Sequence, residues 1–236
     1  TLYQANGTLL MVNQLLRRNL PFDIDRDFMP VHGLVRSSDV LVVRPSLGVK
    51  SVADLVNLAR AKPGALNFGS IGVGSGPHLS MAKLGVAAGF TATHIPYKGG
   101  ADVAKGLLSG EIDFAFSGLG SLIGQVKQGQ IQALAWGGPQ RSAAIPDVPT
   151  LKEAGYTFDT GSWLGWLVPA ATPRAVVERL SADVGRALSA PGVNDKLLPP
   201  LGLEPLNIAQ PQFAALMKQT RSEYATLFSK VEVKLD

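Results

Sequence analysis

The sequence between residues 65 and 121 repeats one local pattern three times: a short apolar run, a loop rich in glycine, and a segment that favours helix. The apolar runs are 65–68, 92–97 and 112–116, and the loops that follow them are 69–76, 98–100 and 117–121. Strands that alternate with helices at this spacing predict a parallel sheet. Right-handed crossovers then place the three loops at one edge of that sheet, beyond the carboxyl ends of the strands.

Each loop leads into a predicted helix N-terminus, where unpaired N–H groups and about half a positive charge favour an anion. We therefore predict that the three loops hold a small anion through the backbone, without any catalytic side chain. The predicted contacts are Ser70, Gly72, Gly74, Ser75 and Gly76 in the first loop, Gly99, Gly100 and Ala101 in the second, and Ser117 and Gly118 in the third. A purely structural role stays open, because tight turns also need glycine, and the first loop lacks the Gly-Lys-Ser/Thr of a nucleotide P-loop.

Further candidates lie beside these loops. His78 enters the predicted helix just after Pro77, and packing against the loop is favoured over ligand contact. Lys98 is interpreted as a solvated charge rather than a ligand partner. Asn6 and Thr8 follow the strand-like run 1–5 and are predicted to face the ligand from the other lobe, although an N-cap role explains Thr8 equally well.

Two tryptophans and two histidines outside the predicted site are interpreted as structural. Trp163 and Trp166 lie in an extended apolar segment and are assigned to the core or to a hinge rather than to ligand stacking. His32 and His94 have no second metal ligand at a useful spacing. We predict no metal and no cofactor.

Composition narrows the class of protein. Hydrophobic residues make up 46% and charged residues 17%, below the roughly 25% charged residues of an average soluble domain, which indicates a compact globular chain rather than a disordered one. The net charge is +4 and the basic residues are scattered, with Arg17-Arg18 as the adjacent pair, so a nucleic-acid partner is not expected. The chain has no cysteine, which excludes disulfides and thiolate catalysis. No run approaches 18 apolar residues, so no direct membrane insertion is predicted.

The order of elements predicts an α/β protein of two lobes. Residues 1–64 and 162–236 form the first lobe, and residues 65–161 form a second lobe inserted into it, with the turn Lys62-Pro63-Gly64 as the first crossing. We expect each lobe to be a mostly parallel sheet flanked by helices. Two crossings allow hinged closure over a ligand cleft between the lobes.

Several motifs carry a resemblance to a known family. They are Asn67-Phe68-Gly69-Ser70 with Gly72, Gly74-Ser75 and Pro77-His78-Leu79, then His94-Ile95-Pro96-Tyr97-Lys98-Gly99-Gly100-Ala101, then Pro146-Asp147-Val148-Pro149-Thr150 with Glu153-Ala154-Gly155, and Ser162-Trp163 through Pro169 to Thr172-Pro173. Together they resemble the extracytoplasmic solute-binding proteins of tripartite tricarboxylate transporters, the Bug family. The resemblance runs over almost the whole chain, in order.

The resemblance implies a type II periplasmic-binding-protein-like fold and a binding protein rather than an enzyme. It implies that a small carboxylate is captured in the periplasm by backbone N–H groups, hydroxyls and waters, with Tyr97 in the motif at the second loop, and is passed to membrane permease subunits. We expect a monomer. Family members resemble this chain but carry an additional N-terminal strand–loop–helix segment that completes the ligand clamp. The chain starts inside a strand-like run without a signal peptide, so we expect upstream sequence and weaker binding without it.

Two alternatives belong to other functional classes. An enzyme on a similar bilobal fold is disfavoured, because the sequence has no Gly-x-Ser-x-Gly, no His-Glu-x-x-His and no histidine beside a credible nucleophile. An effector-binding domain of a regulator would normally be fused to a helix-turn-helix, and none is evident. Which carboxylate is bound stays open, because recognition through the backbone leaves few side chains from which to infer ligand shape.

Overall fold

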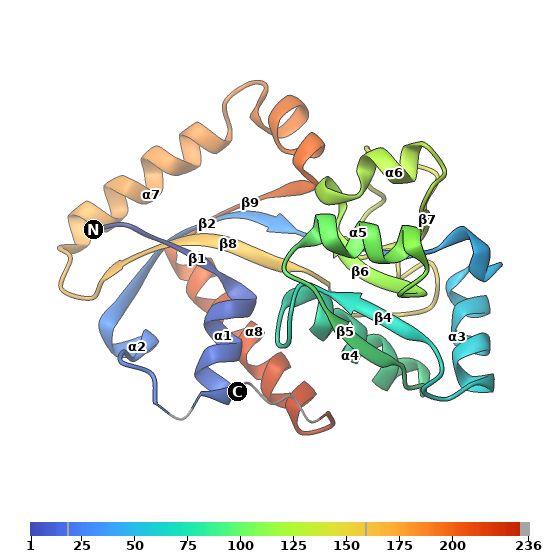
Figure 1. Ribbon diagram of the computed structural model, residues 1–236. Coiled ribbons are helices and arrows are strands. Elements are labelled where there is room, and N and C mark those ends of the chain that lie inside the picture. The colour runs from blue at the N-terminus through green and yellow to red at the C-terminus, as the bar shows by residue number, and fades with distance from the viewer. Residues whose placement is uncertain (18, 159, 232–236) are drawn as a thin grey trace. The chain divides into compact units, whose positions relative to one another are not determined.

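The computed structural model describes residues 1–17, 19–158 and 160–231, which form two compact units (Figure 1). The first unit contains residues 1–37 and the described residues from 162 onward, and the second contains the described residues of 38–161. Each unit has its own sheet and is described by itself. The cleft expected between them stays a prediction.

The first boundary between the units differs from the predicted one at residue 64, because the chain enters the second unit at Ser38. Strand β3 (Asp39–Val43) pairs with two strands of the second sheet, and helix α3 (Val52–Ala61) packs into the same core. The turn at Lys62-Pro63-Gly64 therefore lies inside the second unit. A crossing at Ser37-Ser38 has no proline or glycine to mark it in the sequence. The second boundary lies between Gly161 and Ser162.

The second sheet has the strand order β5-β4-β6-β3-β7. The three strands expected to be parallel are so: β4 (Asn67–Ser70) pairs in parallel with β5 (Thr93–Pro96) and with β6 (Phe114–Gly118). Strand β3 runs antiparallel to β6 and to β7 (Gln132–Trp136). The sheet is therefore mixed. Its parallel part consists of β4, β5 and β6, the strands of the three repeats predicted from the sequence.

Helices cover both faces of this sheet because its strands alternate apolar side chains between two cores. Leu41 and Val43 of β3 face the cluster that contains α3 and α4 (Gly76–Ala88). Val40 and Val42 face the cluster that contains α5 (Gly100–Ser109). All four are 0% exposed, and full burial of such a side chain contributes about 1.5–3 kcal/mol. The core thus holds α4 on one face of the sheet and α5 on the other.

The prediction that a helix directly follows the third glycine loop is wrong in detail. Strand β6 continues through Gly118, a single 3-10 turn η2 (Leu119–Ser121) follows, and α6 (Ile123–Lys127) is short. The hydroxyl of Ser121 donates to the carbonyl of Gly118, 2.8 Å away, which closes the turn. The third strand–loop–helix repeat therefore lacks the full helix N-terminus that the first two repeats have.

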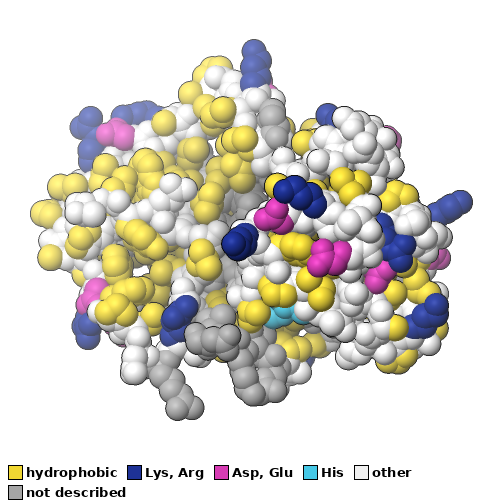
Figure 2. All heavy atoms as spheres, in the orientation of Figure 1, with side chains coloured by type: hydrophobic (Ala, Val, Ile, Leu, Met, Phe, Trp, Pro, Cys, Tyr) yellow, Lys and Arg dark blue, Asp and Glu magenta, His cyan; other side chains and the backbone are white. Residues whose placement is uncertain are grey.

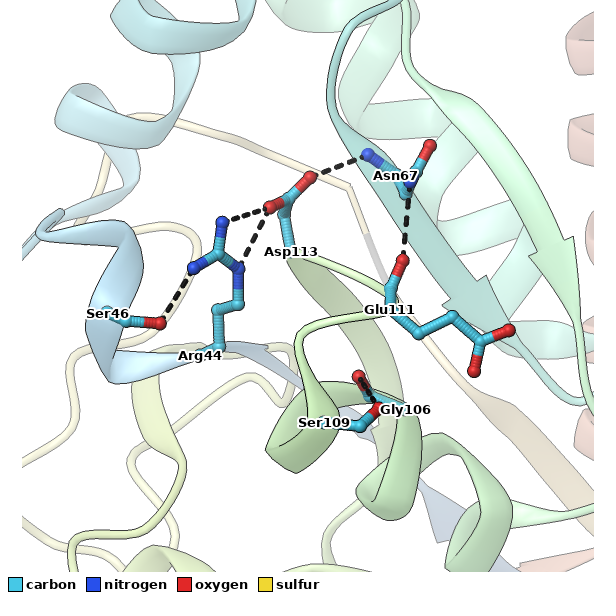
Figure 3. A network of polar contacts seen from close by, with 7 residues as sticks. All are labelled: Arg44, Ser46, Asn67, Gly106, Ser109, Glu111 and Asp113. Carbon is cyan, nitrogen blue, oxygen red and sulfur yellow. Dashed lines mark hydrogen bonds and ion pairs between the residues drawn. The ribbon is translucent and has the colours of Figure 1, made fainter.

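A charged network ties together the opposite edge of the sheet, where β4 and β6 begin and β3 ends (Figure 3). Arg44, which lies just before the 3-10 turn η1 (Pro45–Leu47), forms an ion pair of 2.8 Å with Asp113. The other carboxylate oxygen of Asp113 accepts the backbone N–H of Asn67 at 2.8 Å. The side-chain amide of Asn67 donates to the carbonyl of Glu111. This edge is closed by side chains.

The sheet of the first unit has the order β1-β8-β2-β9, and all of its pairings are antiparallel. Its strands are β1 (Tyr3–Asn6), β2 (Phe28–Ser37), β8 (Ser162–Pro169) and β9 (Leu203–Ala209). The expectation of a mostly parallel sheet is wrong for this unit. Strands β1 and β2 run the same way, but β8 returns from the second unit and lies between them in the opposite direction.

The helices of the first unit lie on both faces of its sheet (Figure 1). Helix α7 (Arg174–Leu188) packs on one face of β2, and α8 (Gln210–Phe228) packs on the other, beside α1 (Gly7–Leu16). The remaining helical segments are short, and they are α2 (Ile24–Asp27), the π-helical η3 (Val193–Leu197) and the 3-10 turn η4 (Pro199–Leu201).

Hydrophobic side chains gather on the face of the first unit that Figure 2 shows. Leu2, Tyr3 and Leu9 are 41%, 47% and 58% exposed, beside the edge strand β1. In the part of the chain that the structure describes, we find no helix with the length and apolar character needed to span a bilayer.

Candidate functional site

The carboxyl ends of β4, β5 and β6 lie along one edge of the second sheet, as the sequence predicts, because the three strands are parallel neighbours. Helices α4 and α5 begin at this edge, directly after their glycine loops. We call this the open edge, and we call the edge that carries Arg44 and Asp113 the closed edge.

The first loop is held by hydrogen bonds within itself. The hydroxyl of Ser70 accepts the N–H of Gly72 at 3.1 Å and lies 2.7 Å from Nε2 of His94. The hydroxyl of Ser75 donates to the carbonyl of Gly72 at 2.7 Å. Ser70 is 0% and Ser75 9% exposed. Both predicted serines therefore build the loop, and their side chains have little capacity left for a ligand.

Two glycines of this loop adopt backbone conformations that other residues avoid. The φ angles of Gly72 and Gly74 are +117° and +74°, and a Cβ atom is strained there. The N–H of Gly74 donates to Nδ1 of His78, 3.0 Å away, so that nitrogen carries no proton. Burial, and then the neighbouring His94, lower the pKa of His78 to about 4. His78 thus packs against the loop, as favoured from the sequence.

The starts of α4 and α5 leave backbone donors without partners. Neither helix has a side-chain cap: its N-cap residue is Ser75 for α4 and Gly99 for α5. Among the described residues, the N–H groups of Gly76 and His78 in α4 and of Gly100 and Ala101 in α5 have no acceptor within the protein. Pro77 has no N–H to offer. These are the donors that a helix start normally gives to a cap, to water or to an anion.

The second and third loops approach each other closely at Gly100. A Cβ atom there would overlap the hydroxyl oxygen and Cβ of Ser121 and would lie 3.5 Å from the hydroxyl of Ser117. The two serine hydroxyls are 3.3 Å apart. Glycine is therefore required by packing at this position. Ser121 was not among the predicted residues, and the turn η2 after β6 brings its hydroxyl back to that of Ser117.

The other residues considered in the second and third loops differ in their exposure to solvent. Gly118 is exposed, whereas Ser117 is 1% exposed. Lys98 is exposed and Gly99 partly so.

Tyr97 does not lie at the start of α5. Its ring contacts the backbone of Gly69 and its hydroxyl lies over Gly106, one and a half turns into the helix, where a Cβ atom would overlap it. Burial, and then Glu111, raise the pKa of Tyr97 to about 12. The side chain of Tyr97 is therefore part of the core of the second unit.

In the first unit, Asn6 and Thr8 have internal partners. The N-cap of α1 is Asn6, whose side chain accepts the N–H of Leu9 at 3.1 Å, so an N-cap role for Thr8 is wrong. The hydroxyl of Thr8 lies 3.0 Å from that of Tyr224, and its N–H donates to the hydroxyl of Ser162. Thr8 is 2% exposed. The start of α1 is thus capped by side chains.

Trp163 lies in the core, as predicted. It is 4% exposed, packs edge-on against Phe213, and donates from Nε1 to Thr220. A Cβ atom at Gly7 would overlap its ring. His32 is also structural, with Nδ1 2.9 Å from the hydroxyl of Ser181 and Nε2 2.8 Å from Oδ1 of Asn207.

A pocket of about 720 Å³ lies on the first unit, between α7, β2 and the start of α8. None of the predicted ligand-binding residues lines it. Within the described ranges, no group of three or more histidine, aspartate or glutamate side chains is placed to hold a metal ion.

The sequence profile described as "Tripartite tricarboxylate transporter family receptor" matches residues 1–233. The chain therefore belongs to the tripartite tricarboxylate transporter receptor family. A UPF0065 protein from the tcbD-tcbE intergenic region of Pseudomonas sp. (strain P51) is 32% identical over 233 residues, which cover 98% of this chain and 68% of that protein. This chain spans about two thirds of the length of the curated relatives it matches, with 64% for two others.

Solved structures show the same fold. A protein described as a periplasmic transporter has a TM-score of 0.86 and 31% identity, covering 100% of this chain and 79% of that one. An R. palustris protein solved with adipate has a TM-score of 0.86 and 28% identity, covering 97% and 77%. MatC from Rhodopseudomonas palustris, with bound malate, has a TM-score of 0.80 and 26% identity, covering 96% and 78%. The fold class is thus that of the periplasmic binding proteins, an α/β fold of mixed sheets flanked by helices.

Proposed function

We propose that the open edge of the second unit binds the carboxylate group of a small organic acid through backbone N–H groups. The observation that carries this proposal is the pair of uncapped helix starts on one sheet edge, with unused donors at Gly76, His78, Gly100 and Ala101. Both helices are long enough, at 13 and 10 residues, to present a positive N-terminal end. Of the residues predicted from the sequence, Gly76, His78, Gly100 and Ala101 keep a direct role in this proposal, through their backbone N–H groups.

The free energies support several donors acting together. A ligand bound with micromolar affinity needs about 8 kcal/mol of net binding free energy. Hydrogen bonds to a charged group contribute about 1.5–3 kcal/mol each, and association costs at least about 4 kcal/mol. Four N–H donors at two helix starts supply about 6–12 kcal/mol before that cost. One loop alone is too weak, so we propose that the loops act together.

The ligand class that we propose is a small dicarboxylate. Adipate and malate, with which two of the similar structures were solved, both carry two carboxylates on a short carbon chain. One carboxylate would lie at the starts of α4 and α5, with the hydroxyls of Ser117 and Ser121 nearby.

The biological role that we propose is solute capture in the periplasm for the membrane permease subunits of a tripartite tricarboxylate transporter. The family membership and the likeness to a periplasmic transporter support it. We propose that the protein releases its ligand unchanged and acts as a monomer.

Calorimetry tests this proposal. Adipate, malate, citrate, glutamate and benzoate are titrated into the protein, and mass spectrometry follows each acid during incubation. We expect saturable heat from at least one dicarboxylate, and no product. Absence of binding by all five acids would contradict the proposed ligand class, and conversion of any of them would contradict the binding role.

A further inference from the structure

Three aromatic rings from three elements stack beneath the first loop of the open edge. The ring centroids of His78 (α4) and His94 (β5) are 4.3 Å apart with an interplanar angle of 20°, and those of His94 and Phe68 (β4) are 4.8 Å apart at 22°. The parallel register places Phe68 beside His94. The sheet therefore sets the pair Phe68 and His94, and the start of α4 adds His78 to it.

Each imidazole of the stack contacts the loop at a different point. Nδ1 of His78 accepts the N–H of Gly74 at 3.0 Å, two residues before the free donor of Gly76. Nε2 of His94 lies 2.7 Å from the hydroxyl of Ser70, which in turn accepts the N–H of Gly72. The two glycines with left-handed backbone conformations are thus the two that the histidines hold, directly or through Ser70.

The contact at Gly74 exists in one protonation state only. A neutral imidazole accepts at its unprotonated nitrogen, whereas an imidazolium has a donor at both nitrogens. If Nδ1 of His78 takes a proton, two donors face each other at Gly74 and the contact is lost. A charge on His78 would also lie against the neighbouring ring of His94.

Other titratable groups about the stack are few. Strands β4 and β6 carry none, and β5 carries His94 alone, followed by Tyr97. Helix α4 carries Lys83, and β3 carries Asp39, whose carboxylate accepts the hydroxyl of Ser80 on α4 and is influenced by Lys83. No acidic group favours a charge on His78: burial and His94 both disfavour it.

We propose that His78 is a positioning residue of the carboxylate site, which holds the first loop in its binding conformation as a neutral imidazole stacked on His94 and releases it on acidification. The inference rests on the proposed function, since it concerns the loop that precedes the donors of α4. It assigns to the imidazole of His78 an action on the ligand through Gly74, in addition to the direct contact proposed for the backbone N–H of His78.

The direction of the pH dependence follows from the lowered pKa of His78. Its ordinary value is 6.5 and its value in the fold is about 4. Between these pH values His78 is protonated in the unfolded chain but neutral in the folded one. The free energy of unfolding of the second unit therefore falls as the pH is lowered through this range. Burial also lowers the pKa of His94, which adds to the same trend.

Two substitutions separate positioning from simple packing. His78→Asn keeps an acceptor at the same distance along the side chain and cannot be protonated, and His78→Leu keeps apolar bulk without an acceptor. The pH titration of the Gly74 amide is followed by ¹H–¹⁵N NMR in the full chain from pH 7.5 to 3, which spans the pKa of His78 on both sides. Affinity for adipate and malate is measured at pH 7.5 and at pH 5 for all three proteins.

We expect the wild-type Gly74 amide to shift with a midpoint near the pKa of His78 and to stay fixed in His78→Asn. We expect His78→Leu to bind about 3- to 10-fold more weakly at pH 7.5, the loss of one neutral hydrogen bond, and His78→Asn to recover most of that affinity. Protonation of the acids themselves affects all three proteins equally.

The proposal is overturned if the Gly74 amide does not titrate below pH 6, or if the leucine and asparagine variants bind equally well with the wild-type pH profile. If the wild type binds neither acid, the dicarboxylate function fails instead, and the Gly74 titration still decides whether His78 holds the loop.

Discussion

The open and closed edges of the second sheet differ in whether side chains satisfy the backbone N–H donors. At the closed edge, a backbone donor is satisfied by a charged side chain: Asp113 accepts the N–H of Asn67 and pairs with Arg44 (Figure 3). Elsewhere in the same unit, Ser51 caps α3 by accepting the N–H of Asp54. At the open edge, the starts of α4 and α5 have no side-chain cap, and their donors have no acceptor within the described chain.

This difference shows where stability and binding reside in one small unit. At one edge the backbone donors have side-chain partners, and removal of one member of such a charged pair is costly. Leaving N–H groups unpaired at the other edge costs stability, which a bound anion can return. The comparison predicts that substitutions at the closed edge change unfolding, while substitutions at the open edge change affinity.

The largest expected effect is at the closed edge. Asp113→Ala removes the carboxylate partner of the Arg44 guanidinium and of the Asn67 N–H. In the native pair the side chains of Arg44 and Asp113 are 26% and 11% exposed. We expect a loss of about 3 kcal/mol in the free energy of unfolding, measured with urea, and unchanged affinity per folded molecule. Arg179→Ala, which breaks an exposed pair with Asp183, is the control and should cost less than about 0.5 kcal/mol.

Gly100→Val tests the open edge. The new side chain would overlap Ser121 and force the second and third loops apart. We expect affinity for the best dicarboxylate to fall at least about tenfold, or about 1.4 kcal/mol, with cooperative unfolding retained. Gly124→Ala is the matched control, because a Cβ atom there meets nothing within 4 Å. Equal affinity of the two variants in calorimetry would remove the second loop from the site.

Ala101→Asp should move stability and binding in opposite directions. An acidic side chain in the first turn of α5 complements the helix dipole and should raise the free energy of unfolding by about 0.3–1 kcal/mol. The same charge repels an incoming carboxylate, so affinity should fall. Ala101→Asn controls for size. A rise in both quantities for the aspartate variant would mean that α5 does not receive the anion.

A smaller effect is expected at Asp39, which is 5% exposed and accepts the hydroxyl of Ser80 at 2.9 Å. Burial raises the pKa of Asp39 from 3.8 to about 6. Because the folded value is the higher one, its contribution to stability is fully present below pH 3.8 and is lost as the pH rises through about 6. Thermal unfolding of Asp39→Asn should therefore lose part of the pH dependence in this range. Identical wild-type and variant profiles would contradict the raised pKa.

The sequence predicts the open edge better than the rest of the molecule. Short apolar runs followed by glycine loops locate β4, β5 and β6, because these signals are local. The packing of Gly100 against Ser121 depends on a crossover between strands, which no local pattern contains.

Pairing direction and unit boundaries are also non-local. Strand β8 lies between β1 and β2 although it follows them by more than a hundred residues, and this makes the first sheet antiparallel. Strand β9 contains Pro205, a residue that argues against a strand in a sequence, yet at a sheet edge its missing N–H is tolerated. Asn6 rather than Thr8 caps α1 because β1 leads directly into the helix, which begins at Gly7.

The most direct test of backbone recognition is a ¹H–¹⁵N spectrum of the glycine-labelled protein during titration with the dicarboxylate that binds best. We predict that the amides of Gly76 and Gly100 move downfield with saturation, while those of Gly110 and Gly129, which already donate to Leu107 and Val126, stay in place. Saturable binding that leaves Gly76 and Gly100 unmoved would contradict the account.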